Sequence, residues 1–456
     1  MTGRTQVTAM NALVPGSRPV EVGPLVFSAA GKWPAGQLLS WAGSLAGALP
    51  EATAAVNLCE RRENFLVGFV ALLMRGQTCL MPPSRAPAVV TQVMDAHPGA
   101  YVLDDSTVDQ CRAAVGVARG FPDIPPDRVV VVGYTSGSTG QPMANPKTWG
   151  SFVASTRLNA ERLREALGGA NEDVAPWIVA TVPPQHMYGM ELSVLMPLLG
   201  GAGIHGAHPL YPADVAAALE DLPAPRVLVT TPVHLRAVLE SGIELPALGA
   251  VVCATAPLAQ DAAKAVEERF HTTVLEFFGS TETCVIASRR TAVEAAWRPY
   301  PGVTLHPHAQ GTTVGAPWFP EDILLQDVLE LRDDGGFVVR GRNADMVEVA
   351  GKRASLADLT RRLLSVPGVS DAVVFQPDAR AGGQVERLAA LAVADGLTEA
   401  QVLAGLKGEM DPVFLPRPLA LVPRLPRNEV GKLPRDNLIA ALKRWRGARR
   451  PAANHP

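Results

Sequence analysis

The sequence predicts an α/β fold, with a large N-terminal domain of stacked mixed or parallel sheets and a smaller α+β domain at the C-terminus. Short β-branched runs such as residues 128–135 and 226–232 have the composition of buried strands. Between such runs lie stretches like 214–222, whose apolar residues recur every three or four positions, as they do in helices. Strands that alternate with helices indicate parallel sheets with helices on their faces.

The composition of the chain changes near residue 340, where we place the domain boundary. Residues 333–353 are rich in glycine and charge, and beyond them two helical patterns alternate with strand patterns. We therefore expect domains at 1–342 and 343–456, with a hinge at residues 343–345. The second domain, of about a hundred residues, has a common domain size.

Composition and charge exclude several classes of protein. The chain has 456 residues, of which 47% are hydrophobic and 19% charged, and its net charge of −3 is not that of a nucleic-acid binder. Its five cysteines have no metal-type spacing, so we expect neither zinc nor a disulfide framework, but a reducing cytoplasm. No apolar run reaches the roughly 20 residues that span a bilayer, and no export signal is expected.

A loop of glycines and hydroxyl residues follows the apolar run 128–133. Glycines let the backbone curl close to a ligand and direct its N–H groups inward, which suits a polyphosphate. A solvated turn is the alternative, and the Gly-Lys-Ser/Thr ending of a Walker loop is absent. The loop comprises Thr135, Ser136, Gly137, Ser138, Thr139 and Gly140.

Other stretches offer groups that would complement a nucleotide. Thr281 and Glu282 end a predicted strand, and a carboxylate at that position can hold Mg²⁺. Asp327 can accept hydrogen bonds from two ribose hydroxyls. Arg342 and Lys432 add cations, the latter in a loop next to glycine.

Four segments in this order resemble the acyl-adenylate-forming (AMP-binding) superfamily of acyl-CoA synthetases, peptide-synthetase adenylation domains and luciferases. They are "YTSGSTGQP" (134–142), "FGSTE" (278–282), "GRNADMVEVAGKRASLADL" (341–359) and "PRNEVGKLPR" (426–435). The resemblance covers about residues 125–435. Within the family, the short N-terminal region and "PPQHMYGME" are most similar to aryl-acid:acyl carrier protein ligases of xanthomonadin and aryl polyene pigment pathways.

The resemblance implies an enzyme that joins a carboxylic acid to ATP, with Mg²⁺, releases pyrophosphate and passes the acyl group to a thiol. It implies that residues 135–140 hold the β- and γ-phosphates, that Thr281 contacts the α-phosphate, and that Glu282 serves Mg²⁺. Asp327 and Arg342 would bind the ribose, and Lys432, on a mobile C-terminal lid, would bridge the carboxylate and the ribose. The residues implied to flank adenine and the acyl pocket are Thr255, Ala256, Pro257, Phe277, Phe278 and Gly279.

The chain departs from the family pattern at two positions. Met143 stands where a lysine that contacts pyrophosphate is usual. Lys147 either replaces that lysine or is an ordinary exposed lysine, and both readings stay open here. Ala344 stands at the hinge where aspartate or lysine is usual, and the neighbouring Asp345 is the alternative polar anchor.

The segment from His186 to Tyr188 is expected to line the acid site, with His186 also a candidate catalytic residue. Adenylation domains for amino acids place aspartate where Met187 stands, and an unpaired ammonium buried there would cost several kcal/mol. We therefore expect a flat aryl acid, such as 3- or 4-hydroxybenzoate. Its hydroxyl could reach Glu191 or His205, although both have structural roles as the alternative, and His186 could equally be a packed core side chain.

The basic C-terminal segment bears on the thiol acceptor. It is either a solvated helix end or a docking surface for an acidic acyl carrier protein, and free CoA is the alternative acceptor. A fatty acid in place of the aryl acid, or a non-catalytic nucleotide-binding protein, are further alternatives. The basic residues are Arg424, Arg427, Lys432, Arg435, Lys443, Arg444, Arg446, Arg449 and Arg450.

Overall fold

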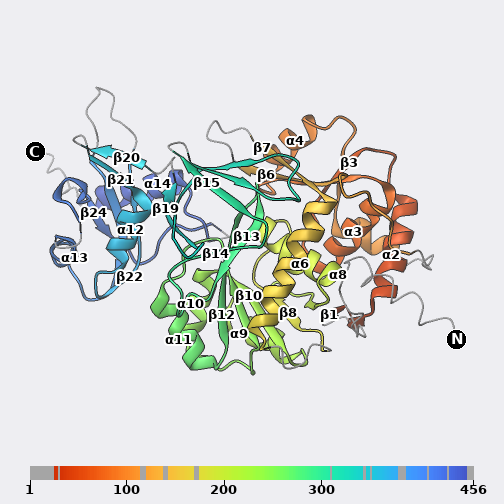
Figure 1. Cartoon of the computed structure of the whole chain (residues 1–456), viewed down its shortest axis with the longest axis horizontal. Coiled ribbons are helices and arrows are strands. Elements are labelled where there is room, and N and C mark those ends of the chain that lie inside the picture. The colour runs from red at the N-terminus through yellow and green to blue at the C-terminus, as the bar shows by residue number, and fades with distance from the viewer. Residues whose placement is uncertain are drawn as a thin grey trace, which may run out of the picture. The chain divides into compact units, whose positions relative to one another are not determined.

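The chain folds into two compact units, one of Met1–Val303 with Ala316–Glu321 and one of Thr304–Gly315 with Asp322–Pro456. Both combine helices with strands, which confirms the predicted α/β class (Figure 1). The structure is a computed structural model, and it describes residues 25–28, 31–112, 120–136, 142–168, 174–308, 311–342, 346–349, 352–377, 387–407, 410–428 and 431–448.

The first unit is built on two sheets. The larger has nine strands in the order β14-β13-β12-β11-β10-β8-β9-β1-β2, and the smaller has five in the order β5-β3-β4-β6-β7. Strands β8, β10, β11 and β12 pair in parallel, so their carboxyl ends meet at one edge of the larger sheet, where α/β proteins bind ligands. Figure 1 shows β8, β10 and β12 in the same sheet, where β11 lies between β10 and β12.

The larger sheet is formed by β1 (Val26–Ser28), β2 (Gly31–Trp33), β8 (Trp177–Ala180), β9 (Gly203–His205), β10 (Arg226–Thr230), β11 (Ala250–Cys253), β12 (Thr273–Ser280), β13 (Cys284–Arg289) and β14 (Arg298–Pro299). The smaller sheet is formed by β3 (Ala54–Asn57), β4 (Thr78–Met81), β5 (Tyr101–Leu103), β6 (Val129–Ser136) and β7 (Pro142–Thr148).

Helices bury the apolar faces of both sheets. Helix α3 (Arg62–Arg75) is buried from Arg62 to Leu73, and its residues are apolar on nearly every side, as expected of a core helix. The remaining helices of this unit are α2 (Ala35–Ala48), α4 (Pro87–Asp95), α5 (Asp105–Arg112), α6 (Trp149–Ala166), α7 (Met187–Met190), the π-helical turn η1 (Glu191–Leu195), α8 (Met196–Leu199), α9 (Pro212–Glu220), α10 (Pro232–Ser241) and α11 (Gln260–Phe270).

The second unit consists of small sheets with helices against them. Its strands are β15 (Thr304–His308), β16 (Gly311–Gly315), β17 (Ile323–Leu325), β18 (Asp327–Leu331), β19 (Phe337–Arg342), β20 (Met346–Val349), β21 (Lys352–Ser355), β22 (Val369–Phe375), β23 (Ala389–Ala394) and β24 (Leu419–Leu421). Its helices are α12 (Leu356–Leu364), α13 (Glu399–Leu406), the 3₁₀ turn η3 (Pro412–Phe414) and α14 (Arg435–Ala448).

The second unit begins earlier in the chain than the predicted C-terminal domain. Strand β19 contacts α12 and β21, which follow the predicted boundary. Strands β15 and β16 contact β18, which pairs with β19, so these earlier strands belong to the second unit as well. The predicted hinge at 343–345 lies outside the described residues. The domain boundaries at 342 and 343 therefore stay a prediction.

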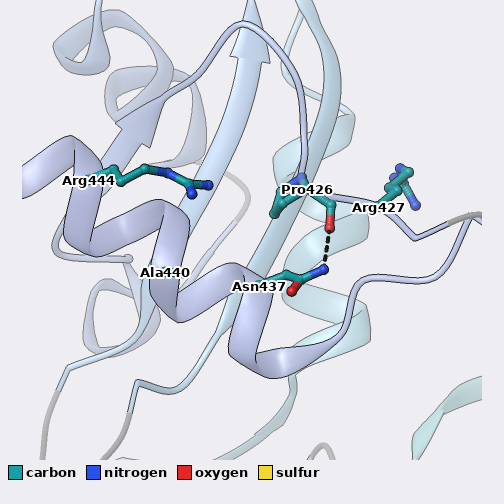
Figure 2. Close-up of a pocket in the computed structure, with 5 residues that line it drawn as sticks. All are labelled: Pro426, Arg427, Asn437, Ala440 and Arg444. Carbon is teal, nitrogen blue, oxygen red and sulfur yellow. Dashed lines mark hydrogen bonds between the residues drawn. The ribbon is translucent and has the colours of Figure 1, made fainter. Parts of the chain in front are cut away.

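Helix α14 covers a shallow hollow of about 260 Å³ in the second unit (Figure 2). Asn437 Nδ2 donates a hydrogen bond of 3.3 Å to the main-chain oxygen of Pro426, which ties the helix to the preceding loop. Arg427 and Arg444 also line this hollow. Among the described residues, no helix is both long and apolar enough to cross a membrane.

Two histidines, His205, which is buried, and His234, which is half-buried, make the stability of the fold depend on pH. Burial lowers the pKa of His205 and of His234, although hydrogen bonding to Asp221 opposes this for His205. In the unfolded chain a histidine has a pKa of about 6.5, so below this pH the unfolded state binds protons that the native state resists. We expect the melting temperature to fall as the pH is lowered from about 7.5 to about 5.5.

His205→Asn, which cannot titrate, tests this expectation. Its melting temperature should fall less between the two pH values than that of the unchanged protein. Parallel slopes would show that His205 does not contribute to the pH dependence.

Candidate active site

The carboxyl end of β12 carries two of the predicted site residues in a tight turn. Ser280 Oγ accepts hydrogen bonds from the main-chain nitrogens of Glu282, at 3.2 Å, and Thr283, at 3.3 Å. The turn therefore braces itself and presents the half-buried side chains of Thr281 and Glu282. Within the described part of the chain, no hydrogen bond or ion pair engages the Glu282 carboxylate, which fits a ligand for a hard cation.

Gly279 permits this turn because the returning strand passes very close to it. A Cβ at this position would lie 2.1 Å from the main-chain oxygen of Cys284, a distance that no side chain tolerates. The requirement for glycine here is therefore a matter of space at the β12–β13 hairpin. It fixes where Thr281 and Glu282 emerge.

A second hairpin, β6–β7, meets this turn from the smaller sheet. Its register places Thr135 opposite Met143, Gly133 opposite Asn145, and Val131 opposite Lys147. Cross-strand partners and alternate residues share one face of a sheet, so Gly133, Thr135, Asn145 and Lys147 lie on the same face.

Contacts show that this face lies against the β12–β13 turn. Lys147 Nζ donates a hydrogen bond to the main-chain oxygen of Glu282. A Cβ on Gly133 would lie 2.9 Å from both Met187 Cε and Thr281 Cγ2. The structure thus brings together residues predicted for three tasks: the pyrophosphate lysine, the α-phosphate threonine and the acid pocket.

The contacts of Lys147 settle one alternative and leave the other open. Lys147 is only 6% exposed, so the reading of an ordinary exposed lysine is wrong. Met143, by contrast, is 60% exposed. Gly137, Ser138, Thr139 and Gly140 lie outside the described residues, as does the side chain of Ser136, so their predicted phosphate contacts stay a prediction.

The predicted acid segment is fixed to the ends of the parallel strands. His186 precedes α7, and its Nδ1 accepts a hydrogen bond of 3.3 Å from the main-chain nitrogen of Tyr188. Tyr188 donates its hydroxyl to the main-chain oxygens of Val252, at 2.9 Å, and Thr230, at 3.3 Å. Burial raises the pKa of Tyr188 well above its ordinary value, so its hydroxyl stays neutral and serves to hold Met187 in place.

Glu191 and His205 have the structural roles that the sequence left as an alternative. Glu191 is 1% exposed, and its carboxylate accepts hydrogen bonds from Asn159 Nδ2 at 3.2 Å and from the main-chain nitrogen of Val285 at 3.0 Å. Ser155 Oγ also donates to it. His205 contacts Asp221 at 3.2 Å and stacks on Phe27. The contacts of both residues favour support of the fold over contact with a ring hydroxyl.

The residues predicted near adenine lie at neighbouring strand ends. Thr255, Ala256 and Pro257 follow β11, and Thr255 has a φ of 82°. Phe278, on β12, is half-buried and packs on Trp297 with ring centroids 5.3 Å apart. Because β11 and β12 pair in parallel, these groups share one edge of the sheet.

Sequence reasoning missed Arg62, a buried cation behind the acid segment. Arg62 is 1% exposed, and its Nη2 donates to the main-chain oxygens of Ala180 and Val182, both at 3.0 Å. It also donates to Ser193 Oγ. Burial lowers its pKa to about 10, so it remains charged at neutral pH while bracing the chain on either side of the acid segment.

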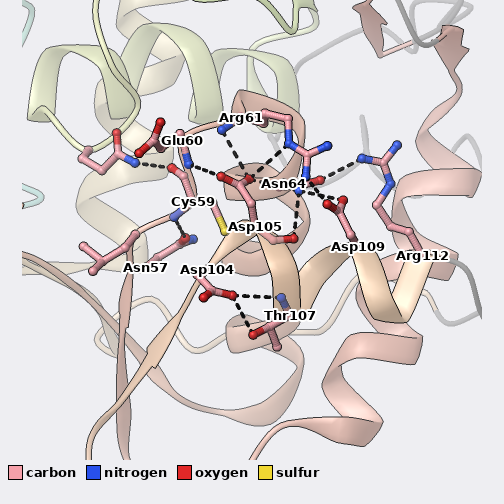
Figure 3. Close-up of polar contacts among 12 residues, drawn as sticks. Asn57, Cys59, Glu60, Arg61, Asn64, Asp104, Asp105, Thr107, Asp109 and Arg112 are labelled. Atoms are coloured by element: carbon pink, nitrogen blue, oxygen red, sulfur yellow. Dashed lines mark hydrogen bonds and ion pairs between the residues drawn. The ribbon is translucent and has the colours of Figure 1, made fainter.

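A polar cluster fixes the start of α3 and so places Arg62 (Figure 3). Asp105 accepts a hydrogen bond of 2.8 Å from the main-chain nitrogen of Glu60, and Asn64 Nδ2 donates to Asp105 Oδ1 at 3.0 Å. Arg112 Nη1 donates to Asn64 Oδ1 at 2.8 Å. In the sequence, Arg62 stands in a run of charged residues, and the side chains of such runs are usually solvated.

The second unit carries the predicted ribose and lid residues. Asp327 and Arg342 are direct partners across the β18–β19 ladder, although the side chain of Arg342 is outside the described residues. Lys432 is exposed, and its main-chain nitrogen donates to Asn428 Oδ1 at 2.8 Å. Arg427, paired with Asp371 at 2.8 Å, donates to the main-chain oxygen of Gly431 and so braces the Lys432 loop.

The β6–β7 hairpin and the turn after β12 bring Lys147, Thr281 and Glu282 together in the first unit, an arrangement that suits a phosphate group and a hard cation. A family model described as AMP-binding enzyme matches residues 84–344, and one for the AMP-binding enzyme C-terminal domain matches residues 361–432. The chain therefore belongs to the AMP-binding enzyme family. This family makes it an AMP-forming acid–thiol ligase that uses ATP and Mg²⁺, as predicted, and argues against a non-catalytic binding protein.

Its relatives include CoA ligases. The chain is 30% identical over 312 residues to a 4-coumarate–CoA ligase of Halorhodospira halophila, covering 66% of this chain and 73% of that protein. It is 25% identical over 401 residues to an indoleacetate–CoA ligase of Aromatoleum aromaticum, covering 79% and 76%.

Among solved structures, an o-succinylbenzoate CoA synthetase from Bacillus subtilis, in complex with ATP and a magnesium ion, has a similar fold. Its TM-score is 0.75 at 17% identity, over 91% of this chain and 96% of that one.

The geometry around Gly279 yields a testable prediction. Gly279→Ala should displace the β12–β13 turn, and because a shift of about 1 Å in a reacting group can cost roughly 10²-fold, we expect a loss of that order in adenylation. The measurement is acid-dependent exchange of labelled pyrophosphate into ATP. Gly36→Ala is the control, because nothing lies within 4 Å of a Cβ there. Unchanged exchange in Gly279→Ala would mean that the turn does not position reacting groups.

Proposed function

We propose that this enzyme activates a hydroxybenzoate-type aryl acid, such as 3- or 4-hydroxybenzoate, and transfers it to the phosphopantetheine thiol of an acyl carrier protein. The observation that carries the aryl assignment is the buried position of Met187 beside Gly133 and Thr281. An apolar side chain there favours a flat ring. It opposes an amino acid, whose ammonium would be left unpaired.

In the first step, a carboxylate oxygen of the acid attacks the α-phosphorus of ATP and pyrophosphate leaves. Negative charge gathers on the phosphate oxygens, and donors placed where it develops lower the barrier. In this scheme Thr281, half-buried in the turn after β12, donates its hydroxyl to the α-phosphate. Glu282 would hold Mg²⁺, which would supply positive charge near those oxygens.

In the second step, a thiol attacks the acyl carbon of the adenylate and AMP leaves. The adenylate is a mixed anhydride, so its phosphate is a good leaving group and the transfer needs positioning more than further activation. The residues that receive the thiol arm are expected from the second unit, as the family resemblance implies.

Two of the relatives act on acids with a ring, coumarate and indoleacetate, which supports an aromatic acid; others act on malonate or sulfoacetate. They also name CoA as the thiol, so free CoA is the second candidate acceptor. The carrier protein is favoured by charge: α14 exposes Lys443 and Arg444, which suit a partner with an acidic surface.

Lys432 provides a test of the adenylation step. Its loop is braced by Arg427 and Asn428, which leaves a cation at a defined place on the second unit. Lys432→Ala should lower the rate of acid-dependent pyrophosphate exchange on the order of 10²–10³-fold, the cost of losing one preorganised donor. Lys407→Ala, another exposed lysine of this unit, is the control. Near-normal exchange in Lys432→Ala would remove its catalytic role.

The substrate and the acceptor are tested together. Pyrophosphate release is measured with benzoic, hydroxybenzoic, cinnamic and medium-chain fatty acids, and then thiol loading is compared between CoA and a holo acyl carrier protein. We expect the highest release with a hydroxybenzoate and the faster loading on the carrier protein. Preference for fatty acids would overturn the aryl assignment, and faster loading of CoA would overturn the carrier-protein assignment.

A further inference from the structure

Lys147 occupies an unusual place for a lysine, because it is buried on β7 with its ammonium turned toward the other sheet. Its Nζ donates to the main-chain oxygen of Glu282, a residue 135 positions away. A buried cation is costly unless it is hydrogen-bonded. The Lys147 side chain thus makes a specific hydrogen bond between the two sheets in addition to its packing contacts.

The turn that carries Thr281 and Glu282 is held at both ends by buried ionisable side chains from other elements. On one side, Lys147 binds the main-chain oxygen of Glu282. On the other, the Glu191 carboxylate accepts the main-chain nitrogen of Val285 at 3.0 and 3.2 Å. Among the described residues, the other side-chain hydrogen bonds of the turn come from Ser280 and Thr283, which belong to the turn itself.

The positive charge of Lys147 also lies near the second support. Burial raises the pKa of Glu191, hydrogen bonds from Ser155, Val285 and Asn159 oppose this, and the charge of Lys147 adds a smaller lowering. The direct action of Lys147 on the turn is its hydrogen bond to the main-chain oxygen of Glu282.

We infer that Lys147 is a positioning residue, which holds the Thr281–Glu282 turn where phosphate and Mg²⁺ bind, and that it does not replace the pyrophosphate lysine absent at Met143. This inference rests on the proposed adenylation role of the turn. It assigns Lys147 an effect on the α-phosphate end of the nucleotide. A lysine in contact with pyrophosphate would instead act only on the β- and γ-phosphates.

AMP, which lacks the β- and γ-phosphates, separates the two roles. Lys147→Met keeps most of the apolar stem and removes the donor. We expect it to weaken AMP binding about 10-fold, the size of one hydrogen bond to a charged group, and MgATP binding by a similar factor. Lys147→Arg, which keeps a cationic donor, should restore part of both affinities. Calorimetric titration with each nucleotide gives these affinities, and the melting temperature reports the stability of each variant.

Lys264→Met on α11 is the matched control, since it exchanges an exposed lysine for methionine in the same unit. It should leave both affinities unchanged. If Lys147→Met weakens MgATP and spares AMP, Lys147 contacts the pyrophosphate portion and the inference is wrong. Unchanged binding of both nucleotides also overturns it.

If Lys147→Met does not fold, Lys147→Arg serves as the test. Weaker binding of MgATP by Lys147→Arg, with unchanged binding of AMP, would contradict the inference. Failure of the unchanged protein to bind AMP or MgATP would count against the proposed function itself. The two failures are therefore distinguishable.

Discussion

The contact between the Lys147 ammonium and the main-chain oxygen of Glu282 joins the two sheets of the first unit at the place where the chemistry is proposed. Strand β7 belongs to the five-stranded sheet, and the turn after β12 belongs to the nine-stranded one. Each sheet alone carries only part of the site. The predicted phosphate loop extends from one, and the threonine and carboxylate extend from the other. The two sheets share one apolar core, and within it the buried polar contact of Lys147 adds a directional constraint on their relative position.

Behind this junction, Arg62 and Glu191 serve the same end by other means. Arg62 holds the main chain at Ala180 and Val182 on the approach to the acid segment, and Glu191 ties α6, η1 and β13 together. Both are buried ionisable groups whose burial would be unfavourable without these hydrogen bonds. The hydrogen bonds that compensate the burial of Arg62 and Glu191 also fix the geometry of the main chain, at a site where small displacements affect the rate. The second unit repeats the pattern on a smaller scale, because the Arg427–Asp371 pair braces the loop of Lys432.

Much of this arrangement could be predicted from the sequence. Alternating β-branched and helical patterns predicted the α/β class, and the order of four motifs predicted the family that the comparisons confirm. Asp327 and Arg342 were expected to act together, and the β18–β19 register makes them direct neighbours. The predictions of fold class and family succeeded because they depend on local periodicity and on motifs whose residue types and order are specific. The ribose contacts of Asp327 and Arg342 stay a prediction.

The remainder depends on contacts between residues far apart in the chain, for which a single sequence gives little signal. Nothing local distinguishes Arg62 from the exposed Arg61 beside it. The burial of Lys147 follows from the partner that crosses from the other sheet, and the structural roles of Glu191 and His205 follow from donors on α6, β13 and the Asp221 side chain. Asn145 lies on the same face of β7 as Lys147, which is two residues further along. Alternation along a strand predicts this placement from the sequence alone.

The most direct test is a crystal structure of the enzyme with a non-hydrolysable analogue of 4-hydroxybenzoyl adenylate, in which a sulfamate replaces the phosphate. The account predicts the sulfamate within hydrogen-bonding distance of the Thr281 hydroxyl and the aromatic ring against Met187. An analogue bound away from the junction of the two sheets, or a ring directed away from Met187, would contradict it.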